Sequence, residues 1–314
     1  MTEYPMFFEP IFKERIWGGN QLKSFGYDLP FDHTGECWGI AAHRNGQSVI
    51  KNGAHKGKTL GELWKNERHL FEDFPGERFP LLTKILDAAQ DLSVQVHPDN
   101  EYAEKHEGEP GKTECWYVID CEEGAEIVYG HHAKSRKELE FMIKNAQWEK
   151  LLHKVPVKKG DFYFVPSGTI HAIGAGITIL ETQQNSDTTY RVYDYDRKDQ
   201  NGNKRELHIE KSIAVTTVPA SIPEMKETVE VGGDRKVIHY VENEYFTVEK
   251  WQINGSFVVE QPYPFQLVSV ISGFGSVTTA GACYEFNKGD HFLLPCGIGE
   301  LEFKGESELI IAHV

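Results

Sequence analysis

The chain has 314 residues, which is enough for two domains that each bury a core. Its 39% apolar and 26% charged residues are typical of a soluble protein, and no apolar run approaches the length that spans a bilayer. We therefore expect a cytoplasmic protein without a membrane partner. The net charge of -15 argues against nucleic acid or an anionic membrane surface as a partner.

The first half of the chain is predicted to mix helices with strands. Residues 59–73 carry apolar side chains at helical spacing, with Thr59 as the N-cap and Glu62 completing a capping box. Residues 135–152 show the same pattern, with a capping box of Ser135 and Glu138. We also expect a short helix at 100–106 and strands at 79–86, 92–96, 116–119 and 126–129.

From residue 155 onward the chain is predicted to be mostly strand and turn. Residues 162–165 are apolar at every position, which predicts a strand buried on both faces; strands at 177–180 and 190–193 follow. Residues 216–235 are polar and contain prolines, so we place a domain boundary there. The predicted domains are 1–235 and 236–314, and the second should contain about eight short strands.

An internal repeat supports this division. Residues 159–166 and 288–295 both read Lys-Gly-Asp, then an apolar strand, then proline, which is typical of a hairpin in a double-sheet jelly-roll barrel. His171 stands five residues after the first proline, whereas Glu300 stands five after the second. The sequence therefore predicts a mainly β fold of two jelly-roll barrels, with helices inserted in the N-terminal part and no metal site in the C-terminal barrel.

Four polar side chains in apolar surroundings form a candidate metal site: Gln95, His97, Glu114 and His171. On a strand, residues two apart project from one face, so Gln95 and His97 should point together. Two imidazoles, a carboxylate and an amide oxygen can hold a divalent ion and leave a position open for chemistry. The competing interpretation is that the histidines are ordinary hydrogen-bonded structural residues.

The five cysteines are odd in number and lack CxxC spacing, which argues against a disulfide framework and against a structural zinc ribbon. Cys115 adjoins Glu114 in sequence, but on a strand the two side chains point to opposite faces. We therefore interpret Cys115 as a packing residue.

Basic residues accompany the candidate ligands. Lys112 shares a strand face with Glu114, Arg191 follows Asp187 by four residues, and Lys84 is an isolated charge in an apolar strand. Such cations would suit a substrate that carries a phosphate on an oxygen-rich carbon chain. The alternative is a set of structural ion pairs, for example Lys112 with Glu114 and Arg191 with Asp187.

Four motifs in order give the chain a family resemblance: residues 95–99, 111–117, 166–172 and 184–194, with Trp17-Gly18-Gly19 and Gly35-Glu36-Cys37-Trp38 before them. The chain resembles the type I mannose-6-phosphate isomerases, in their short bacterial form, over essentially its whole length. Compared with longer members it lacks helical material between Glu114 and His171, so substrate contacts made there do not carry over.

The resemblance implies a cupin fold with one Zn²⁺ held by Gln95, His97, Glu114 and His171. It implies interconversion of mannose 6-phosphate and fructose 6-phosphate, with Arg191 as an active-site residue and Lys112 and Asp187 as further catalytic candidates. Trp17, Glu36 and Lys84 are expected to bind the sugar phosphate, which is the expected partner of a monomer or homodimer.

Two other functions fit part of the pattern. A cupin oxygenase would use Fe²⁺ or another redox metal on the two histidines and the glutamate. A carbohydrate-binding or regulatory protein would have a degenerate site, which the presence of Lys112, Asp187 and Arg191 argues against.

Overall fold

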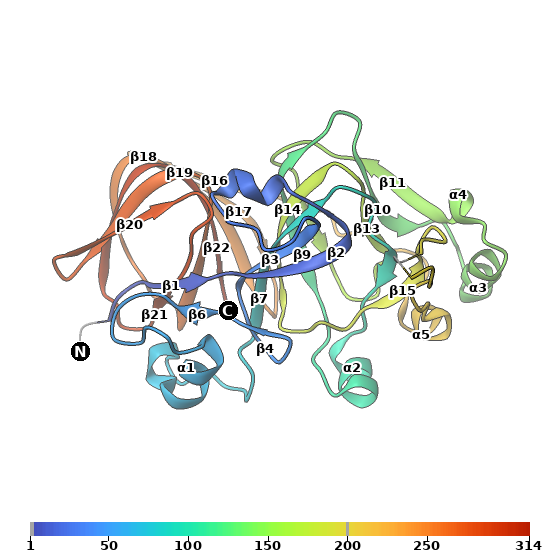
Figure 1. The fold of residues 1–314 in the computed structure, drawn as a ribbon, viewed down its shortest axis with the longest axis horizontal. Coiled ribbons are helices and arrows are strands. Elements are labelled where there is room, and N and C mark those ends of the chain that lie inside the picture. Colours follow the sequence, from blue (N-terminus) through green and yellow to red (C-terminus); the bar gives the residue numbers. More distant parts are fainter. Residues whose placement is uncertain (1–2, 199–200) are drawn as a thin grey trace.

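The computed structural model describes residues 3–198 and 201–314, so residues 1, 2, 199 and 200 of the predicted first domain lie outside it. Figure 1 shows two β-lobes side by side, with the C-terminal strands in one and the middle of the chain in the other. The prediction of a mainly β fold with two barrels and few helices is confirmed. No helix among the described residues has the length and apolar character needed to cross a membrane.

The first lobe consists of two facing sheets. One has the strand order β11-β10-β13-β8-β15, with the bounds Leu152–Pro156, Glu126–His131, His171–Ile173, Val94–Val96 and Tyr190–Tyr193. The other has the order β12-β9-β14-β7-β2-β3, with the bounds Phe162–Val165, Glu114–Cys121, Ile177–Gln184, Leu81–Ala88, Ile11–Gly19 and Thr34–Ile40. An apolar cluster that includes Trp17, Trp116 and Ile127 fills the space between these sheets.

The second lobe is one nine-stranded sheet that closes around its own apolar cluster. Its C-terminal strands are β16 to β22, with the bounds Thr228–Gly232, Arg235–Glu242, Thr247–Glu260, Phe265–Thr279, Ala282–Asn287, His291–Pro295 and Glu300–His313. Two strands from the start of the chain complete it, since β1 (Met6–Glu9) pairs with β21 and with β6 (Val49–Ile50).

The expectation of about eight short strands after residue 236 is wrong. Three of the strands there, β18, β19 and β22, run for 14 or 15 residues, and β22 pairs with the other two along most of its length. They stay continuous because glycines stand at the bends: Gly255 and Gly305 are cross-strand partners and both have positive φ. Glycine adopts this conformation at little cost. In the sequence, however, a glycine interrupts the apolar pattern and is interpreted as the end of a strand.

The predicted helices are present close to their expected positions. α1 (Leu60–Asn66) begins at Thr59 with the full capping box, and the 3-10 helix η2 (Arg68–Phe71) follows it. α2 spans Asn100–Glu107. Residues 135–152 form two helices, α3 (Arg136–Lys144) and α4 (Trp148–Leu151), and the second capping box is incomplete because Glu138 accepts from Lys134 N instead of Ser135 N.

Smaller elements complete the chain: the 3-10 helix η1 (Gln21–Phe25), the hairpin of β4 (Ala42–His43) with β5 (Gly46–Gln47), and α5 (Ile209–Val215). Figure 1 places α3, α4 and α5 together at the end of the first lobe farthest from the second. The Lys-Gly-Asp repeats precede β12 and β21, and in both copies the aspartate accepts from the backbone N–H three residues earlier.

The central strands β9, β14 and β7 of the six-stranded sheet are buried on both faces over nearly their whole length. In β9, Trp116 packs inside the first barrel, whereas Cys115 and Tyr117 belong to a third cluster that includes Phe265 and Leu293 of the second lobe. This confirms the packing role of Cys115. β12 is an edge strand, so residues 162–164 are only half-buried and the expectation of burial on both faces is wrong for them.

Candidate active site

The register of the five-stranded sheet brings three of the predicted site residues into one row. Gln95 of β8 lies directly opposite His171 of β13 and opposite Arg191 of β15. Residues directly opposed in antiparallel strands carry their side chains on the same face. His97, two residues after Gln95, belongs to that face too.

The facing sheet supplies the carboxylate. Glu114 opens β9 and has 0% exposure, and His97 and His171 have 1% each. Glu114 Oε2 lies 3.5 Å from His97 Nε2, and Glu114 Oε1 lies 3.4 Å from His171 Nε2. One ligand atom from each residue lies within 4.8 Å of the other two, and this is the one such cluster of His, Cys, Asp and Glu among the described residues.

Backbone carbonyls fix the orientation of both imidazoles. His97 Nδ1 lies 2.9 Å from the Thr188 carbonyl, and His171 Nδ1 lies 2.8 Å from the Thr169 carbonyl. A carbonyl oxygen only accepts, so each Nδ1 must carry the proton and donate it. Each Nε2 is then an unprotonated lone pair that faces Glu114. Metal-ligating histidines are typically held by a hydrogen bond of this kind.

Burial keeps both rings neutral. It lowers the pKa of His171 to about 4, and burial together with the charge of Lys112 lowers the pKa of His97 well below its usual range. His171 Nε2 has no hydrogen-bond partner. Two imidazole lone pairs and a buried carboxylate therefore converge, and no proton lies between His171 Nε2 and Glu114. A bound cation would stabilise this arrangement.

The donor set and its spacing fit a divalent ion. Nitrogen and oxygen ligands about 2.0–2.1 Å from a tetrahedral Zn²⁺ are roughly 3.4 Å from one another, close to the separations of Glu114 from the two imidazoles. The Gln95 amide lies on the same sheet face as His171 and is the remaining candidate ligand.

Lys112 lies against this cluster. Its Nζ is 2.7 Å from Glu114 Oε2 and 3.0 Å from His97 Nε2. Burial opposes the charged form, but the carboxylates of Glu114 and Glu181 raise the pKa of Lys112 above its usual value. In this geometry the side chain is an ammonium ion that forms the ion pair considered in the sequence analysis.

A cavity of about 480 Å³ opens beside the cluster. It gathers the remaining predicted catalytic and substrate-binding residues together with one predicted ligand: Trp17, Glu36, Lys84, Gln95, Lys112, Asp187 and Arg191. His97, Glu114 and His171 are not among its lining residues. The structure thus brings the ten predicted site residues to one place, as a buried cluster and an adjoining cavity.

Two of the lining residues make contacts that differ from the expected ion pair. Arg191 donates to Ser93 Oγ at 3.3 Å and to the Glu206 carbonyl at 2.8 Å, and no ion pair joins it to Asp187. Asp187 Oδ2 instead accepts from Asn45 Nδ2 at 2.8 Å. Backbone and hydroxyl acceptors hold the Arg191 guanidinium without neutralising its charge.

Cationic and anionic side chains line the cavity wall and form ion pairs with one another. Glu36 lies 2.8 Å from Arg15 and accepts from Trp38 Nε1 at 2.6 Å. Burial opposes ionisation of Glu36, yet Lys84 and Arg15 lower its pKa to about 2. Lys84 is 4% exposed and its Nζ lies 3.5 Å from Glu181. The isolated lysine in an apolar strand is therefore both cavity-lining and ion-paired.

Sequence reasoning missed Glu181. This carboxylate of β14 is 3% exposed, lines the cavity, and accepts from Trp116 Nε1 at 3.1 Å. Burial raises its pKa, and the charge of Glu114 raises it further. The signal was an isolated carboxylate in the apolar run 177–181, the same signal that singled out Lys84. Arg15 and Arg205 also line the cavity and were not predicted.

Comparisons with known proteins give the family. Residues 6–140 match the catalytic domain of type I phosphomannose isomerases, and residues 236–314 match the cupin domain of mannose-6-phosphate isomerases. The chain is 58% identical over 317 residues to the mannose-6-phosphate isomerase ManA of Bacillus subtilis, with 100% of each chain covered. It is 54% identical to the mannose-6-phosphate isomerase of Streptococcus mutans, with 98% of each covered.

A solved structure agrees with these relatives. The crystal structure of the mannose 6-phosphate isomerase from Bacillus subtilis superposes with a TM-score of 0.97 at 50% identity, covering 100% of both chains. The resemblance found in the sequence motifs is confirmed, and the chain belongs to the type I phosphomannose isomerase family of enzymes.

Proposed function

We propose that this chain interconverts mannose 6-phosphate and fructose 6-phosphate with one bound Zn²⁺, by proton transfer between C2 and C1 through an enediol. The observation that carries the proposal is the convergence of two oriented imidazoles and a carboxylate beside a cavity rich in cations. The names of the relatives supply the substrate class.

His97, Glu114 and His171 would hold the ion, with the Gln95 amide as the fourth ligand. When bound, Zn²⁺ supplies a Lewis acid that polarises an oxygen of the substrate. The remaining work falls to side chains around the cavity.

Cations in the cavity suit a dianionic phosphate and the negative charge that develops on oxygen in an enediol. Arg191 is the strongest candidate, because Ser93 and the Glu206 carbonyl orient its guanidinium without neutralising it. Arg15, Lys84 and Arg205 line the same cavity. Trp17 and Glu36 contribute an aromatic surface and a hydrogen-bond acceptor for the sugar.

A base must remove the proton next to the carbonyl and return it to the neighbouring carbon. Asp187 lines the cavity with its carboxylate held by Asn45. Lys112 is charged in the geometry described here, so it would act first as a proton donor or a positive charge. Glu181, whose pKa burial raises, is a further candidate for holding a proton.

The test is an isomerase assay on mannose 6-phosphate, with metal analysis of the same sample. We expect turnover, about one zinc per chain, loss of activity with a chelator and recovery with Zn²⁺. Deuterium from D₂O should appear in the product at the carbon that receives the proton. Full activity in metal-free protein would refute the metal's role, and absence of turnover at full zinc loading would refute the reaction.

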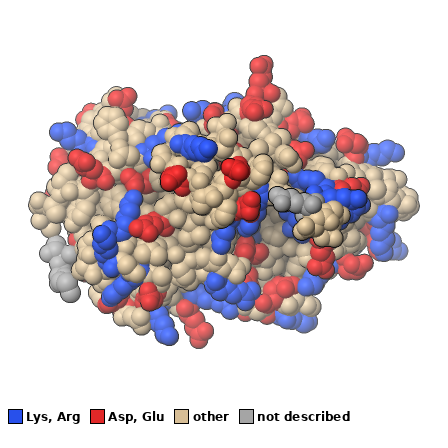
Figure 2. Space-filling view, in the orientation of Figure 1, with Lys and Arg blue, Asp and Glu red and all other residues tan. Residues whose placement is uncertain are grey.

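The cytoplasmic location and the monomer or homodimer state stay predictions. Gel filtration with light scattering tests the second of these. The face in Figure 2 shows Lys and Arg interspersed with Asp and Glu.

A further inference from the structure

The loop between β14 and β15 carries two parts of the candidate active site. The Asp187 side chain lines the cavity, and the Thr188 carbonyl accepts the proton of His97 Nδ1 at 2.9 Å. A small displacement of this loop would rotate or release the His97 ring. The loop is therefore a place where a residue outside the cavity can control the site.

One carboxylate oxygen holds three consecutive residues of the loop. Glu109, which follows α2, is 4% exposed and absent from the lining of the 480 Å³ cavity. Its Oε2 lies 3.4 Å from Ser186 Oγ, 3.3 Å from Asp187 N and 3.0 Å from Thr188 Oγ1. All three of these groups can donate to it, so Oε2 is an acceptor at the centre of the turn.

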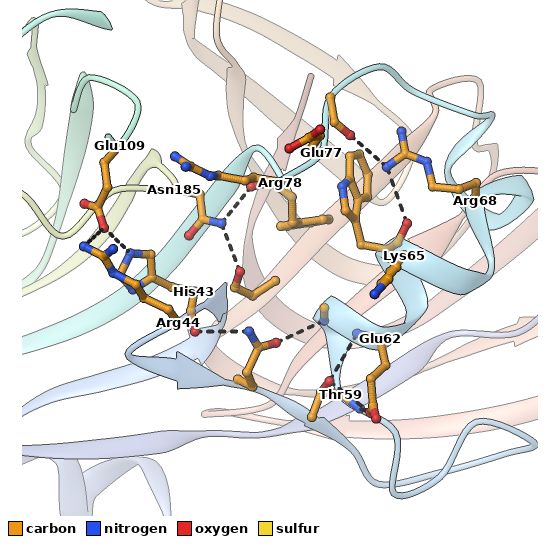
Figure 3. A pocket seen from close by; sticks show the side chains of 16 residues that line it. His43, Arg44, Thr59, Glu62, Lys65, Arg68, Glu77, Arg78, Glu109 and Asn185 are labelled. Atoms are coloured by element: carbon orange, nitrogen blue, oxygen red, sulfur yellow. Dashed lines mark hydrogen bonds and ion pairs between the residues drawn. The ribbon is translucent and has the colours of Figure 1, made fainter. Parts of the chain in front are cut away.

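The second oxygen binds the hairpin of β4 and β5. Glu109 Oε1 lies 3.2 Å from His43 Nε2 and 2.6 Å from an Arg44 guanidinium nitrogen. Figure 3 shows both contacts at the edge of a second cavity, of about 800 Å³, that borders α1. The same hairpin reaches the loop directly, through Asn45 to Asp187. Glu109 is thus held on both sides by groups that donate to its two carboxylate oxygens, with the Arg44 guanidinium as a charged partner on the hairpin side.

We propose that Glu109 is a positioning residue: its carboxylate fixes the turn at residues 186–188, so that the Thr188 carbonyl keeps the Nε2 of His97 directed at the metal position. The proposal rests on the proposed function, because it assigns a role toward the metal ligands. Glu109 touches neither the ligand cluster nor the 480 Å³ cavity of the candidate active site, so it acts through Thr188.

Replacing Glu109 by Gln tests this directly. A glutamine side chain offers one acceptor oxygen where the five contacts of Glu109 need two. If the amide oxygen faces the loop, the amide NH₂ faces the Arg44 guanidinium; in the other orientation it faces the N–H of Asp187. One side of the junction therefore loses its contacts, and the loop or the hairpin must move.

The matched control is Glu249→Gln in the second lobe. Glu249 is 8% exposed and binds His239 Nδ1 at 2.7 Å and Trp251 Nε1 at 2.8 Å, so it is also a buried carboxylate with a histidine partner. Both substitutions remove one buried negative charge. A general loss of stability would affect the two variants alike.

Two readouts are measured at neutral pH on folded protein. In metal-free protein labelled with ¹⁵N-histidine, the His97 ring should be the Nδ1–H tautomer in the wild type and in E249Q, and a mixture in E109Q. Competition with a chelating indicator should give an apparent Zn²⁺ affinity about tenfold weaker in E109Q, in line with losses at residues that orient metal ligands. A wild-type tautomer and affinity in folded E109Q would overturn the proposal.

Thr188→Val provides a second variant in case E109Q does not fold. It removes only the hydroxyl that binds Glu109 and leaves the Thr188 carbonyl in place. We expect a smaller shift of both readouts in the same direction, and no shift in either readout would overturn the proposal. The tautomer readout needs no metal, so failure of the zinc proposal alone leaves it informative.

Discussion

The buried charge cluster around Glu36 makes a prediction about pH and stability. Arg15 and Lys84 hold the pKa of Glu36 at about 2, against an ordinary value of 4.5. Because a pKa difference of one corresponds to about 1.4 kcal/mol, this difference is worth about 3 kcal/mol of folding free energy. The folded-state pKa lies below the unfolded-state pKa, so the contribution is complete above pH 4.5 and is lost as the pH falls toward 2.

The perturbation is Glu36→Gln. It preserves the side-chain volume and an acceptor for Trp38 Nε1, and removes the charge that Arg15 and Lys84 face. At pH 7 we expect the variant to be less stable than the wild type by about 3 kcal/mol. The difference should shrink as the pH is lowered from 5 to 3, because the unfolded wild-type chain then takes up a proton on Glu36 while the folded protein keeps Glu36 ionised.

The assay is urea unfolding of both proteins at pH 7, 5, 4 and 3, followed by circular dichroism. Other carboxylates titrate in the same range, and those distant from Glu36 contribute equally to both proteins and cancel in the difference. Glu302→Gln is the control, since Glu302 is exposed and its one polar contact is Ser256 Oγ; its effect should stay within about 0.5 kcal/mol. A stability difference for Glu36→Gln that is equal at pH 7 and pH 3 would refute the reasoning.

Three further predictions concern the metal, the cation and the contact between the lobes. Glu114→Gln removes the carboxylate that faces both imidazoles, so zinc content measured by mass spectrometry should fall from about one per chain to a small fraction. Arg191→Lys should lower kcat/KM about tenfold or more in the coupled assay with an unchanged circular dichroism spectrum, because lysine lacks the planar fork. Gly39→Ala should cost roughly 1–3 kcal/mol in urea unfolding, because its Cβ would lie 2.5 Å from the ring of His291.

Local pattern was sufficient to predict α1 to α4 and the strands β7 to β10, β12, β14 and β15, whereas α5 and the strands before residue 79 were not predicted. Thr59 with Glu62 predicted the start of α1, and the repeated Lys-Gly-Asp motif predicted the turns that lead into β12 and β21. The expected hairpins are wrong, because β12 pairs with β9, and β21 pairs with β19 and β1, which are not its chain neighbours. These features depend on residues close in sequence, where capping and turn chemistry decide the structure. The long strands of the second lobe were missed because Gly255 and Gly305 mark bends that interrupt an apolar pattern.

The candidate site was predictable only in part, because pairing between distant strands decides which polar groups meet. Lys84 and Glu181 are direct cross-strand partners on β7 and β14, almost a hundred residues apart, and nothing local indicates that register. Glu109 was missed for the same reason. Its partners lie 65 or more residues away, in a hairpin and a loop that no periodicity connects.

The burial of the candidate site depends on both lobes. β9 directs Glu114 and Trp116 to the site and Cys115 and Tyr117 to the second lobe, where Tyr117 accepts from Lys250 Nζ at 2.7 Å. A sheet covered on one face only would leave the backbone of β9, β14 and β7 open to solvent on the other. The second lobe thus covers the outer face of the sheet that carries Glu114, and it contributes in this way to the burial of the proposed metal site.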